Sequence, residues 1–397
     1  MQAVLLVGGF GTRLAHIVKD VPKPMAPIND VPFLKYIYDL LISNGVDNFI
    51  FLTGYLSEKI ENYFKDYSNI RFIKESTPLG TGGALLNAYD YLEDQFFFVN
   101  GDTFFDIDLS ILLNFSKDKT FSMALRFTDN IERYGFVQLK SDSSYRISNF
   151  IEKGKFPNDV IDGYINGGIY CIKKCILNNF LSSFNNQNIS FENDIIPKLV
   201  QANIAFGLPL GGAFIDIGIP EDYQKAQMLI PYTLSAVKRP ALFIDKDGTL
   251  IVDNGYTHGK EINVIDATVQ IVKEYKKKGF YVVIVTNQAG VAKRKFTFQS
   301  MKENINSIEQ AYASFGIYFD DVECCCYHCE SDIPQYAYSS LARKPYPGML
   351  LKACEKLRID MKNSVMIGDN EKTDKILLPY LKSQILANNN LLSNDRA

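Results

Sequence analysis

Two carboxylates separated by one residue could carry out phosphoryl chemistry in the second half of the sequence. Asp245 and Asp247 come directly after the apolar run 241–244, which has the length of a buried strand. A carboxylate can attack phosphorus and form an acyl phosphate. A second carboxylate close by can protonate the leaving alkoxide and then activate water. We therefore expect Asp245 to be a nucleophile and Asp247 a general acid and base.

The groups needed to hold phosphoryl oxygens follow later in the same half. Thr286 ends another apolar run and supplies a hydroxyl, while Lys344 supplies a positive charge. Asp369 follows the apolar run 364–367, with Asp374 nearby. Carboxylate oxygens are the ligands that Mg²⁺ prefers. Three carboxylates are the predicted Mg²⁺ ligands: Asp245, Asp247 and Asp369.

A glycine-rich loop follows the first apolar run of the chain. Glycines let the backbone approach a polyphosphate, although such a loop also serves as a plain turn between strand and helix. Two cations, Arg13 and Lys23, the second held between prolines, favour the polyphosphate site. The loop has neither the spacing of a dinucleotide fingerprint nor the Lys-Ser/Thr pair of a Walker loop. The predicted nucleotide contacts here are Gly8, Gly9, Gly11, Thr12, Arg13 and Lys23.

Alternating strand-like and helix-like segments would place these residues at the ends of strands. Such alternation is typical of α/β domains with mostly parallel sheets. Strand character marks residues 3–7, 48–53, 96–100, 241–244, 281–285 and 364–367, and helical spacing marks 33–44 and 268–278. A segment of low periodicity between Pro231 and Pro240 separates two such series. The predicted organisation is a domain at 1–230, a linker at 231–239, a domain at 240–386 and a frayed tail at 387–397.

Composition excludes some partners. The chain has 397 residues, 47% of them hydrophobic, and a formal net charge of −3. This charge gives no reason to expect nucleic acid or an anionic membrane surface as a partner. No run approaches the roughly 20 apolar residues that span a bilayer, and the first residues lack the features of a signal peptide. We expect a cytoplasmic protein with reduced cysteines.

The first half resembles the sugar-1-phosphate nucleotidyltransferases over residues 1–228. The segments that carry the resemblance follow the family's order: 78–84, Asn100-Gly101-Asp102, Glu152-Lys153, Asn166-Gly167-Gly168 and 214–218. The resemblance implies a Rossmann-like, GT-A-like domain in which a sugar 1-phosphate attacks the α-phosphorus of a nucleoside triphosphate. The implied roles are catalysis by Arg13 and Lys23, nucleotide contacts from Gly80, Thr81 and Gly82, Mg²⁺ binding by Asp102 and Asp216, and sugar-phosphate contacts from Glu152, Lys153, Asn166 and Gly167.

Within this family, residues 7–14 and 18–27 look most like the D-glycero-D-manno-heptose 1-phosphate guanylyltransferases. This likeness implies GTP as the nucleotide. Ala15 departs from the basic residue that many relatives carry there. The nucleobase and the anomer of the sugar stay open, because the residues themselves do not specify them.

The second half carries four motifs of the haloacid-dehalogenase phosphatase superfamily. It most resembles the D-glycero-D-manno-heptose 1,7-bisphosphate phosphatases and the histidinol-phosphate phosphatases, through residues 253–256, 286–292 and 343–349. The resemblance implies a Rossmann-like domain and a phosphoaspartate intermediate. No insertion large enough for a separate cap lies between the first two motifs. Asn287 is expected to contact the sugar phosphate and Arg343 to bind a second phosphate.

A zinc loop found in many of these relatives is incomplete here. Cys326 and His328 fit the first pair of ligands, but Ser340 and Ala342 occupy the places of the second pair. Structural zinc needs four good ligands. We therefore expect no zinc, although neighbouring cysteines offer a substitute set.

The two resemblances point to one pathway. A heptose 1,7-bisphosphate would lose its C7 phosphate, and the heptose 1-phosphate would become GDP-heptose for surface polysaccharide or glycans. Three alternatives remain: another sugar 1-phosphate with another phosphate ester, histidinol phosphate as the phosphatase substrate, or one inactive half that serves in assembly. The sequence specifies no oligomeric state.

Overall fold

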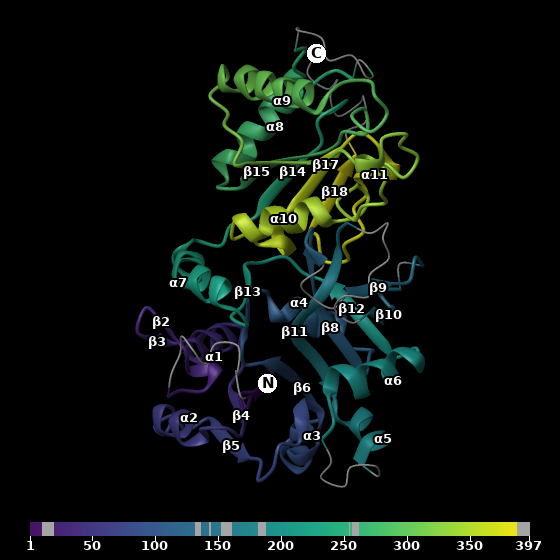
Figure 1. Ribbon diagram of the computed structural model, residues 1–397. Coiled ribbons are helices and arrows are strands. Elements are labelled where there is room, and N and C mark those ends of the chain that lie inside the picture. Colours follow the sequence, from purple (N-terminus) through teal and green to yellow (C-terminus); the bar gives the residue numbers. More distant parts are fainter. Residues whose placement is uncertain are drawn as a thin grey trace. The chain divides into compact units, whose positions relative to one another are not determined.

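The computed structural model describes residues 1–9, 20–131, 136–142, 144–151, 161–181, 188–253, 255 and 262–386. Contacts divide the chain into two compact units (Figure 1). The first contains most of residues 1–236, and the second contains residues 237 onward together with short segments around 127–133 and 154–163. The predicted tail, 387–397, lies outside the described residues.

A mixed sheet of nine strands forms the centre of the first unit, counted over its described residues. Four neighbouring strands are parallel: β1 (Gln2–Leu6), β4 (Asn48–Thr53), β5 (Ile70–Lys74) and β6 (Gln95–Asn100). The predicted apolar runs form β1, β4 and β6, whereas β5 was not predicted. The others are β8 (Phe121–Thr128), β9 (Phe136–Leu139), β10 (Ile147–Ile151), β11 (Gly163–Lys173) and β12 (Ala205–Pro209). β11 runs antiparallel to β6, and β9 runs antiparallel to both β10 and β11. The expectation of a mostly parallel sheet is therefore wrong for this part. The connection between β9 and β10 is too short for a parallel crossover, and β11 runs back along β6 and β9.

Helices and small ribbons surround this sheet. The helices are α1 (Phe33–Ser43), α2 (Ser57–Tyr63), α3 (Gly80–Asn87), α4 (Leu109–Phe115), α5 (Asn178–Leu181), α6 (Ile196–Gln201) and α7 (Pro220–Ser235). One ribbon pairs β2 (Pro27–Ile28) with β3 (Val31–Pro32), and another pairs β7 (Thr103–Phe105) with β13 (Phe214–Asp216). α7 runs through Pro231 and buries Ile230 and Thr233. The predicted linker is thus helical up to residue 235, because burial on the inner face of the helix outweighs the hydrogen bond that proline removes.

The second unit has a parallel sheet of five strands in the order β16-β15-β14-β17-β18. These strands are β14 (Ala241–Ile244), β15 (Tyr281–Asn287), β16 (Asp321–Cys325), β17 (Val365–Gly368) and β18 (Ser383–Leu386). Figure 1 shows α8 (Asp266–Lys277) and α9 (Phe298–Ala313) together on one side of the sheet. Their apolar side chains pack with Leu242 and Ile244 of β14. α10 (Gly348–Lys356) and the short α11 (Glu371–Asp374) complete the unit. The α/β class predicted for both halves is confirmed.

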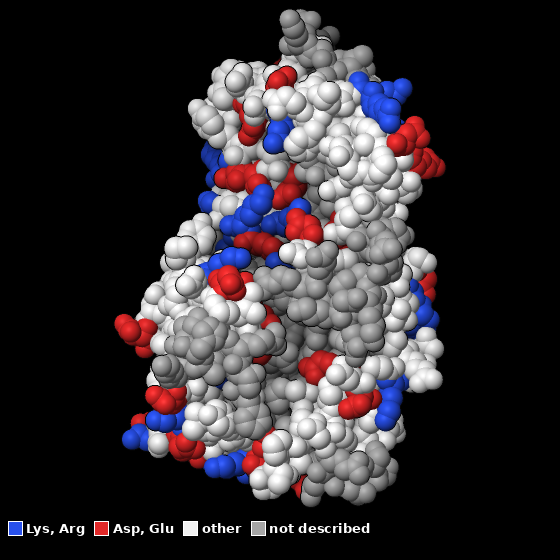
Figure 2. All heavy atoms as spheres, viewed as in Figure 1, with Lys and Arg blue, Asp and Glu red and all other residues white. Residues whose placement is uncertain are grey.

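Two features concern the expected absence of nucleic-acid and membrane partners: the distribution of surface charge and the character of the helices. On the face drawn in Figure 2, basic and acidic side chains are interspersed over the described residues. None of the described helices has the length and apolarity needed to cross a bilayer.

Candidate functional sites

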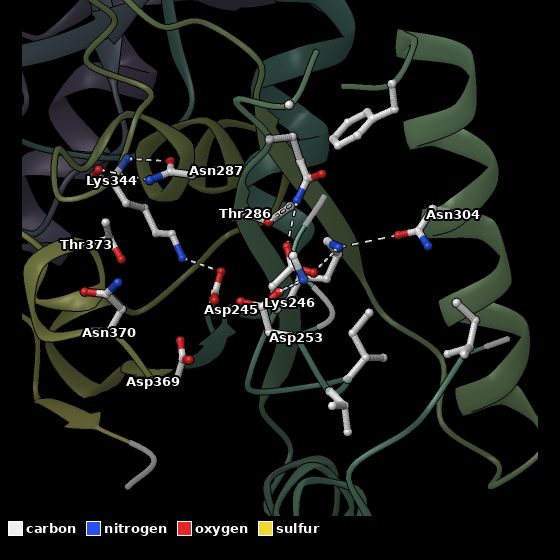
Figure 3. A pocket seen from close by; sticks show the side chains of 18 of the residues that line it. Asp245, Lys246, Asp253, Thr286, Asn287, Asn304, Lys344, Asp369, Asn370 and Thr373 are labelled. Carbon is white, nitrogen blue, oxygen red and sulfur yellow. Dashed lines mark hydrogen bonds and ion pairs between the residues drawn. The ribbon is translucent and has the colours of Figure 1, made fainter. Parts of the chain in front are cut away.

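The carboxyl edge of the parallel sheet opens into a cavity of about 430 Å³ (Figure 3). Asp245 follows β14, Thr286 and Asn287 end β15, and Asp369 follows β17. Carboxyl ends of parallel strands meet at one edge of a sheet, so motifs far apart in sequence converge there. Lys344 reaches the same cavity from the loop before α10. The structure therefore brings together the predicted nucleophile, hydroxyl, lysine and third carboxylate.

A buried lysine joins two of the carboxylates. The Nζ atom of Lys344 lies 2.5 Å from Oδ1 of Asp245 and 2.6 Å from Oδ1 of Asp374. Burial raises the pKa of Asp245 to about 6, Lys344 opposes this rise and Asp374 adds to it. Burial lowers the pKa of Lys344, but the two carboxylates raise it further, so that it lies above its ordinary value. Lys344 is therefore charged at neutral pH and partly neutralises an acidic cluster.

Asp245, Asp369 and Asp374 each offer one carboxylate oxygen, and these three oxygens lie within 4.8 Å of one another. Burial, followed by the charge of Asp374, raises the pKa of Asp369. Three crowded carboxylates repel one another and suit a hard divalent cation with oxygen ligands. This cluster is the one group of three or more potential metal-ligating side chains that the described residues form. Sequence reasoning placed Asp374 only near the site, because α11 is a single turn with a weak sequence signal.

Asp247 does not join this cluster. One of its oxygens, Oδ1, contacts Nζ of Lys246, and Oδ2 accepts a hydrogen bond of 3.1 Å from Nε2 of Gln288. The same Nε2 atom donates to Oγ1 of Thr286 at 2.9 Å. The geometry does not place the Asp247 side chain with the three clustered carboxylates. Sequence reasoning missed Lys246, although its position between the two aspartates was a usable signal.

Asn287 lines the cavity, as a predicted substrate contact would, and its side chain also binds protein. Its Nδ2 atom donates to the backbone oxygen of Lys344 at 3.1 Å, and its Oδ1 atom accepts from the backbone N–H of Lys344 at 3.0 Å. The side chain therefore fixes the loop that carries Lys344. Arg343 lines the cavity, and its Nη1 atom is buried without a hydrogen-bond partner among the described residues. An unpaired guanidinium N–H at a cavity wall fits the predicted contact with a second phosphate.

The first unit places a lysine between two carboxylates as well. Lys23 lies in a 3₁₀ turn (Lys23–Met25), and its Nζ atom is 2.6 Å from Oδ2 of Asp102 and 3.2 Å from Oδ1 of Asp216. The two aspartates meet because β13 pairs with β7, with Asp216 opposite Thr103. Burial and then Asp102 raise the pKa of Asp216, while Lys23 lowers it. This confined negative charge suits the predicted Mg²⁺ site.

The glycine-rich segments are partly described. Gly8 and Gly9 follow β1, whereas Gly11, Thr12, Arg13, Glu152 and Lys153 lie outside the described residues. Gly80 has a φ of +73°, and a Cβ there would lie 2.5 Å from the backbone oxygen of Ile189. Gly82 donates its N–H to that same oxygen at 2.8 Å, and Oγ1 of Thr81 donates to Glu192 at 2.8 Å. These three residues thus pack the start of α3 against residues 189–192, which gives the predicted nucleotide segment a fixed shape.

The predicted sugar-phosphate residues on β11 lie beside the Asp102 turn. The side chain of Asn166 donates to the hydroxyl of Tyr170 at 2.5 Å and accepts from the N–H of Gly168 at 2.9 Å. A Cβ at Gly168 would lie 3.3 Å from Cβ of Asn100, and one at Gly167 would lie 2.7 Å from the backbone oxygen of Ala124. Gly168 therefore lets β11 approach the turn closely, and Gly167 lets it approach β8.

Cys326 and His328, the pair that fits the first half of the incomplete zinc motif, have protein neighbours. The sulfur of Cys326 lies 3.5 Å from that of Met301, inside an apolar cluster with Val291 and Ile305. Burial raises the pKa of the Cys326 thiol to about 12. Nδ1 of His328 accepts from the N–H of Glu330 at 3.2 Å.

Comparisons with known proteins agree with this division. Residues 2–232 match the family described as Nucleotidyl transferase, and residues 241–384 match the family described as Polynucleotide kinase 3 phosphatase. A D-glycero-alpha-D-manno-heptose 1-phosphate guanylyltransferase of Campylobacter jejuni is 42% identical over 227 residues, 56% of this chain and 97% of that protein. The enzyme of the same name from Aneurinibacillus thermoaerophilus is 41% identical over 235 residues, 57% and 97% of the two chains.

The first unit is also similar to a solved structure. HddC from Yersinia pseudotuberculosis, complexed with GMP-PN, is 34% identical and superimposes with a TM-score of 0.50. The match covers 57% of this chain and 97% of that one. The first unit therefore matches almost the whole of that protein, and the match does not include the second unit.

Proposed function

Because the chain belongs to the nucleotidyl transferase family, and because its second unit is a phosphatase of the haloacid-dehalogenase type, we propose that it makes a nucleotide-activated heptose. The phosphatase unit would remove the C7 phosphate of D-glycero-D-manno-heptose 1,7-bisphosphate. The transferase unit would join the resulting heptose 1-phosphate to GMP from GTP and release pyrophosphate. The product would serve surface polysaccharide or glycan synthesis.

The choice of sugar and nucleotide rests on one observation. Two heptose 1-phosphate guanylyltransferases are more than 40% identical to the first unit over 97% of their own length. The pairing with a phosphatase supports the same pathway, since removal of a distal phosphate would supply the transferase with its substrate. Both reactions use dissolved small molecules, so we place the protein in the cytoplasm.

Nucleotidyl transfer would depend on positioning and charge. An oxygen of the sugar phosphate attacks the α-phosphorus of GTP, and the bond to the β-phosphate breaks. Lys23 remains charged, because the raising effect of two carboxylates exceeds the lowering effect of burial on its pKa. It can therefore stabilise the negative charge that develops on the phosphates. Mg²⁺, when held by Asp102 and Asp216, would neutralise the triphosphate and the leaving pyrophosphate.

Phosphate release would proceed in two balanced steps. A carboxylate oxygen of Asp245 attacks phosphorus, the bond to the sugar oxygen breaks, and Asp247 gives that oxygen a proton. Asp247 then takes a proton from water, whose oxygen attacks the acyl phosphate and restores free Asp245 and phosphate. Lys344 and Thr286 would hold phosphoryl oxygens, and Mg²⁺ among Asp245, Asp369 and Asp374 would offset their charge. Arg343, with its unpaired N–H, is the candidate contact for the second phosphate.

The deciding experiment combines purified protein, heptose 1,7-bisphosphate, GTP and Mg²⁺, with mass spectrometry and phosphate detection. We expect GDP-heptose and one phosphate for each molecule of product. Reactions without GTP, and with ATP, CTP or UTP in its place, test which nucleobase the transferase accepts.

Phosphate without GDP-heptose would reject guanine or heptose for the transferase. Absence of both products would reject heptose and lead to panels of sugar 1-phosphates and phosphate esters, including histidinol phosphate. If only one unit is active on all substrates, the other serves in assembly.

A further inference from the structure

Lys246 is a buried cation to which the mechanism above gives no role. It lies between the two aspartates at the end of β14 and is only 2% exposed. Its Nζ atom contacts Oδ1 of Asp247 and lies 3.4 Å from Oδ1 of Asn304, a buried residue of α9. Figure 3 shows Lys246 in the cavity, linked to Asn304. The cation therefore connects the proton-transfer carboxylate to a helix.

The contact with Asp247 is electrostatically necessary. A buried ammonium group is unfavourable unless an opposite charge and hydrogen-bond acceptors surround it. The Lys246 side chain is 3% exposed, and that of Asp247 is 32% exposed. Lys246 thus has little access to water and depends on Asp247 for its counter-charge, which holds Asp247 to one side.

The second oxygen of Asp247 is held by another element. Oδ2 accepts from Nε2 of Gln288, which follows β15 and also donates to Thr286. Two oxygens bound from two directions fix both the position and the plane of a carboxylate. Gln288 alone would leave the group free to rotate about that single hydrogen bond.

We propose that Lys246, supported by Asn304, is a positioning residue that aims Asp247 at the oxygen of the leaving group. The proposal rests on the phosphatase function proposed above. Proton transfer requires the acid to lie within hydrogen-bond reach of the oxygen that it protonates. A general acid in that position raises the rate of the chemical step about 10²–10⁴-fold. A loosely held Asp247 would lose much of that contribution while Asp245 still attacked phosphorus.

A competing role for Lys246 is direct binding of a second phosphate. Its charge is already paired with Asp247 and its side chain is almost fully buried, so it is poorly placed to bind another anion. Arg343, with an unpaired N–H at the cavity wall, suits that role better. The two roles differ in which substrates a Lys246 variant would affect.

The test compares kcat/KM for three substrates in wild type, Lys246→Met and Asn304→Leu. p-Nitrophenyl phosphate has a leaving group that needs no proton, a simple alkyl phosphate needs one, and heptose bisphosphate needs one and carries a second phosphate. We expect Lys246→Met to lower kcat/KM about 10–100-fold for both alkyl esters and less than about threefold for the aryl ester. Asn304→Leu should give the same pattern with a smaller loss. Lys302→Met, an exposed change on the same helix, should have no effect.

Other patterns would overturn the proposal. Equal loss on all three substrates would mean that Lys246 only supports the fold, and loss confined to the bisphosphate would mean that it binds the second phosphate. If Lys246→Met does not fold, two other variants carry the test. Lys246→Arg must keep kcat/KM for the alkyl esters within about threefold of wild type, and Asn304→Leu must lose kcat/KM for the alkyl esters but not for the aryl ester. Wild-type protein that releases no phosphate from any ester, and forms no phosphoenzyme on Asp245, would refute the phosphatase function itself.

Discussion

Nζ of Lys344 lies 2.5 Å from Oδ1 of Asp245, and both residues are almost fully buried. The contact opposes the effect of burial, which would otherwise keep the carboxyl group protonated and unable to attack phosphorus. The balance leaves the pKa of Asp245 at about 6. The proposed nucleophile is therefore mostly ionised at neutral pH but loses its charge in mild acid.

The first prediction concerns pH. Because the attacking form of Asp245 is the ionised one, the acidic limb of the profile should show kcat/KM for phosphate release rising with pH up to about 6. Below the midpoint it should fall about tenfold for each pH unit. A bound divalent cation favours the ionised form and moves the midpoint lower, so about 6 is its upper limit. A profile with a midpoint well above this value would contradict the prediction.

The second prediction separates the two activities. Asp245→Asn removes the nucleophile, so phosphate release should fall by roughly 10³-fold or more and no phosphoenzyme should form. GDP-heptose formation from heptose 1-phosphate should stay within about twofold, because the transferase residues belong to another unit. Asp332→Asn, at an exposed position of the phosphatase unit, is the matched control. Loss of both activities in a folded protein would refute two independent sites.

A third prediction uses the hydrogen bonds between Asn287 and the backbone of Lys344. Asn287→Ala removes both bonds, which should cost about 1–3 kcal/mol of unfolding free energy. The loop that carries Lys344 would loosen, and phosphate release should fall about tenfold. Asn306→Ala, exposed on α9, should change neither quantity. If Asn287→Ala raised only KM, Asn287 would be a substrate contact after all.

A fourth prediction compares two glycines with similar backbones. Gly248 and Gly279 have φ values of +75° and +83°, so alanine at either should cost about 1–2 kcal/mol of stability. A Cβ at Gly248 would also lie 2.1 Å from Oδ2 of Asp369, whereas nothing lies within 4 Å at Gly279. Gly248→Ala alone should therefore raise the Mg²⁺ concentration needed for half-maximal phosphatase activity. Equal Mg²⁺ dependence in both variants would argue against Asp369 as a ligand.

The fifth prediction concerns the transferase. Lys23→Met should lower kcat for nucleotidyl transfer by about 10²-fold, because it removes charge beside the phosphates. The phosphatase should be unaffected. Lys225→Met provides a control, since the Lys225 side chain is 67% exposed and its nearest ion-pair contact is 3.7 Å. A variant with normal kcat would show that Lys23 serves only to neutralise Asp102 and Asp216.

Strands were the most predictable part of the fold. The runs 48–53 and 241–244 coincide with β4 and β14, because a buried strand requires an uninterrupted apolar segment with polar residues at its ends. The mixed sheet was not foreseen, since β9 and β10 are short and interrupted by polar residues, and the pairing of β9 with β11 depends on contacts distant in sequence.

Residues of the site were predicted where an ordered motif follows a strand. Asp245, Thr286, Lys344 and Asp369 converge on one cavity as expected. The partners of individual atoms were not predictable, because they depend on tertiary distances. Asn287 reaches Lys344 across 57 positions, and Lys246 reaches Asn304 across 58.

Among the described residues, no strand of the nine-stranded sheet pairs with a strand of the five-stranded one. Substitutions can therefore accumulate in either sheet without altering the backbone hydrogen bonds of the other. Both sheets nevertheless belong to one polypeptide chain. A cell that translates this message obtains the two activities in a fixed one-to-one ratio, and changes in expression cannot alter the supply of one relative to the other.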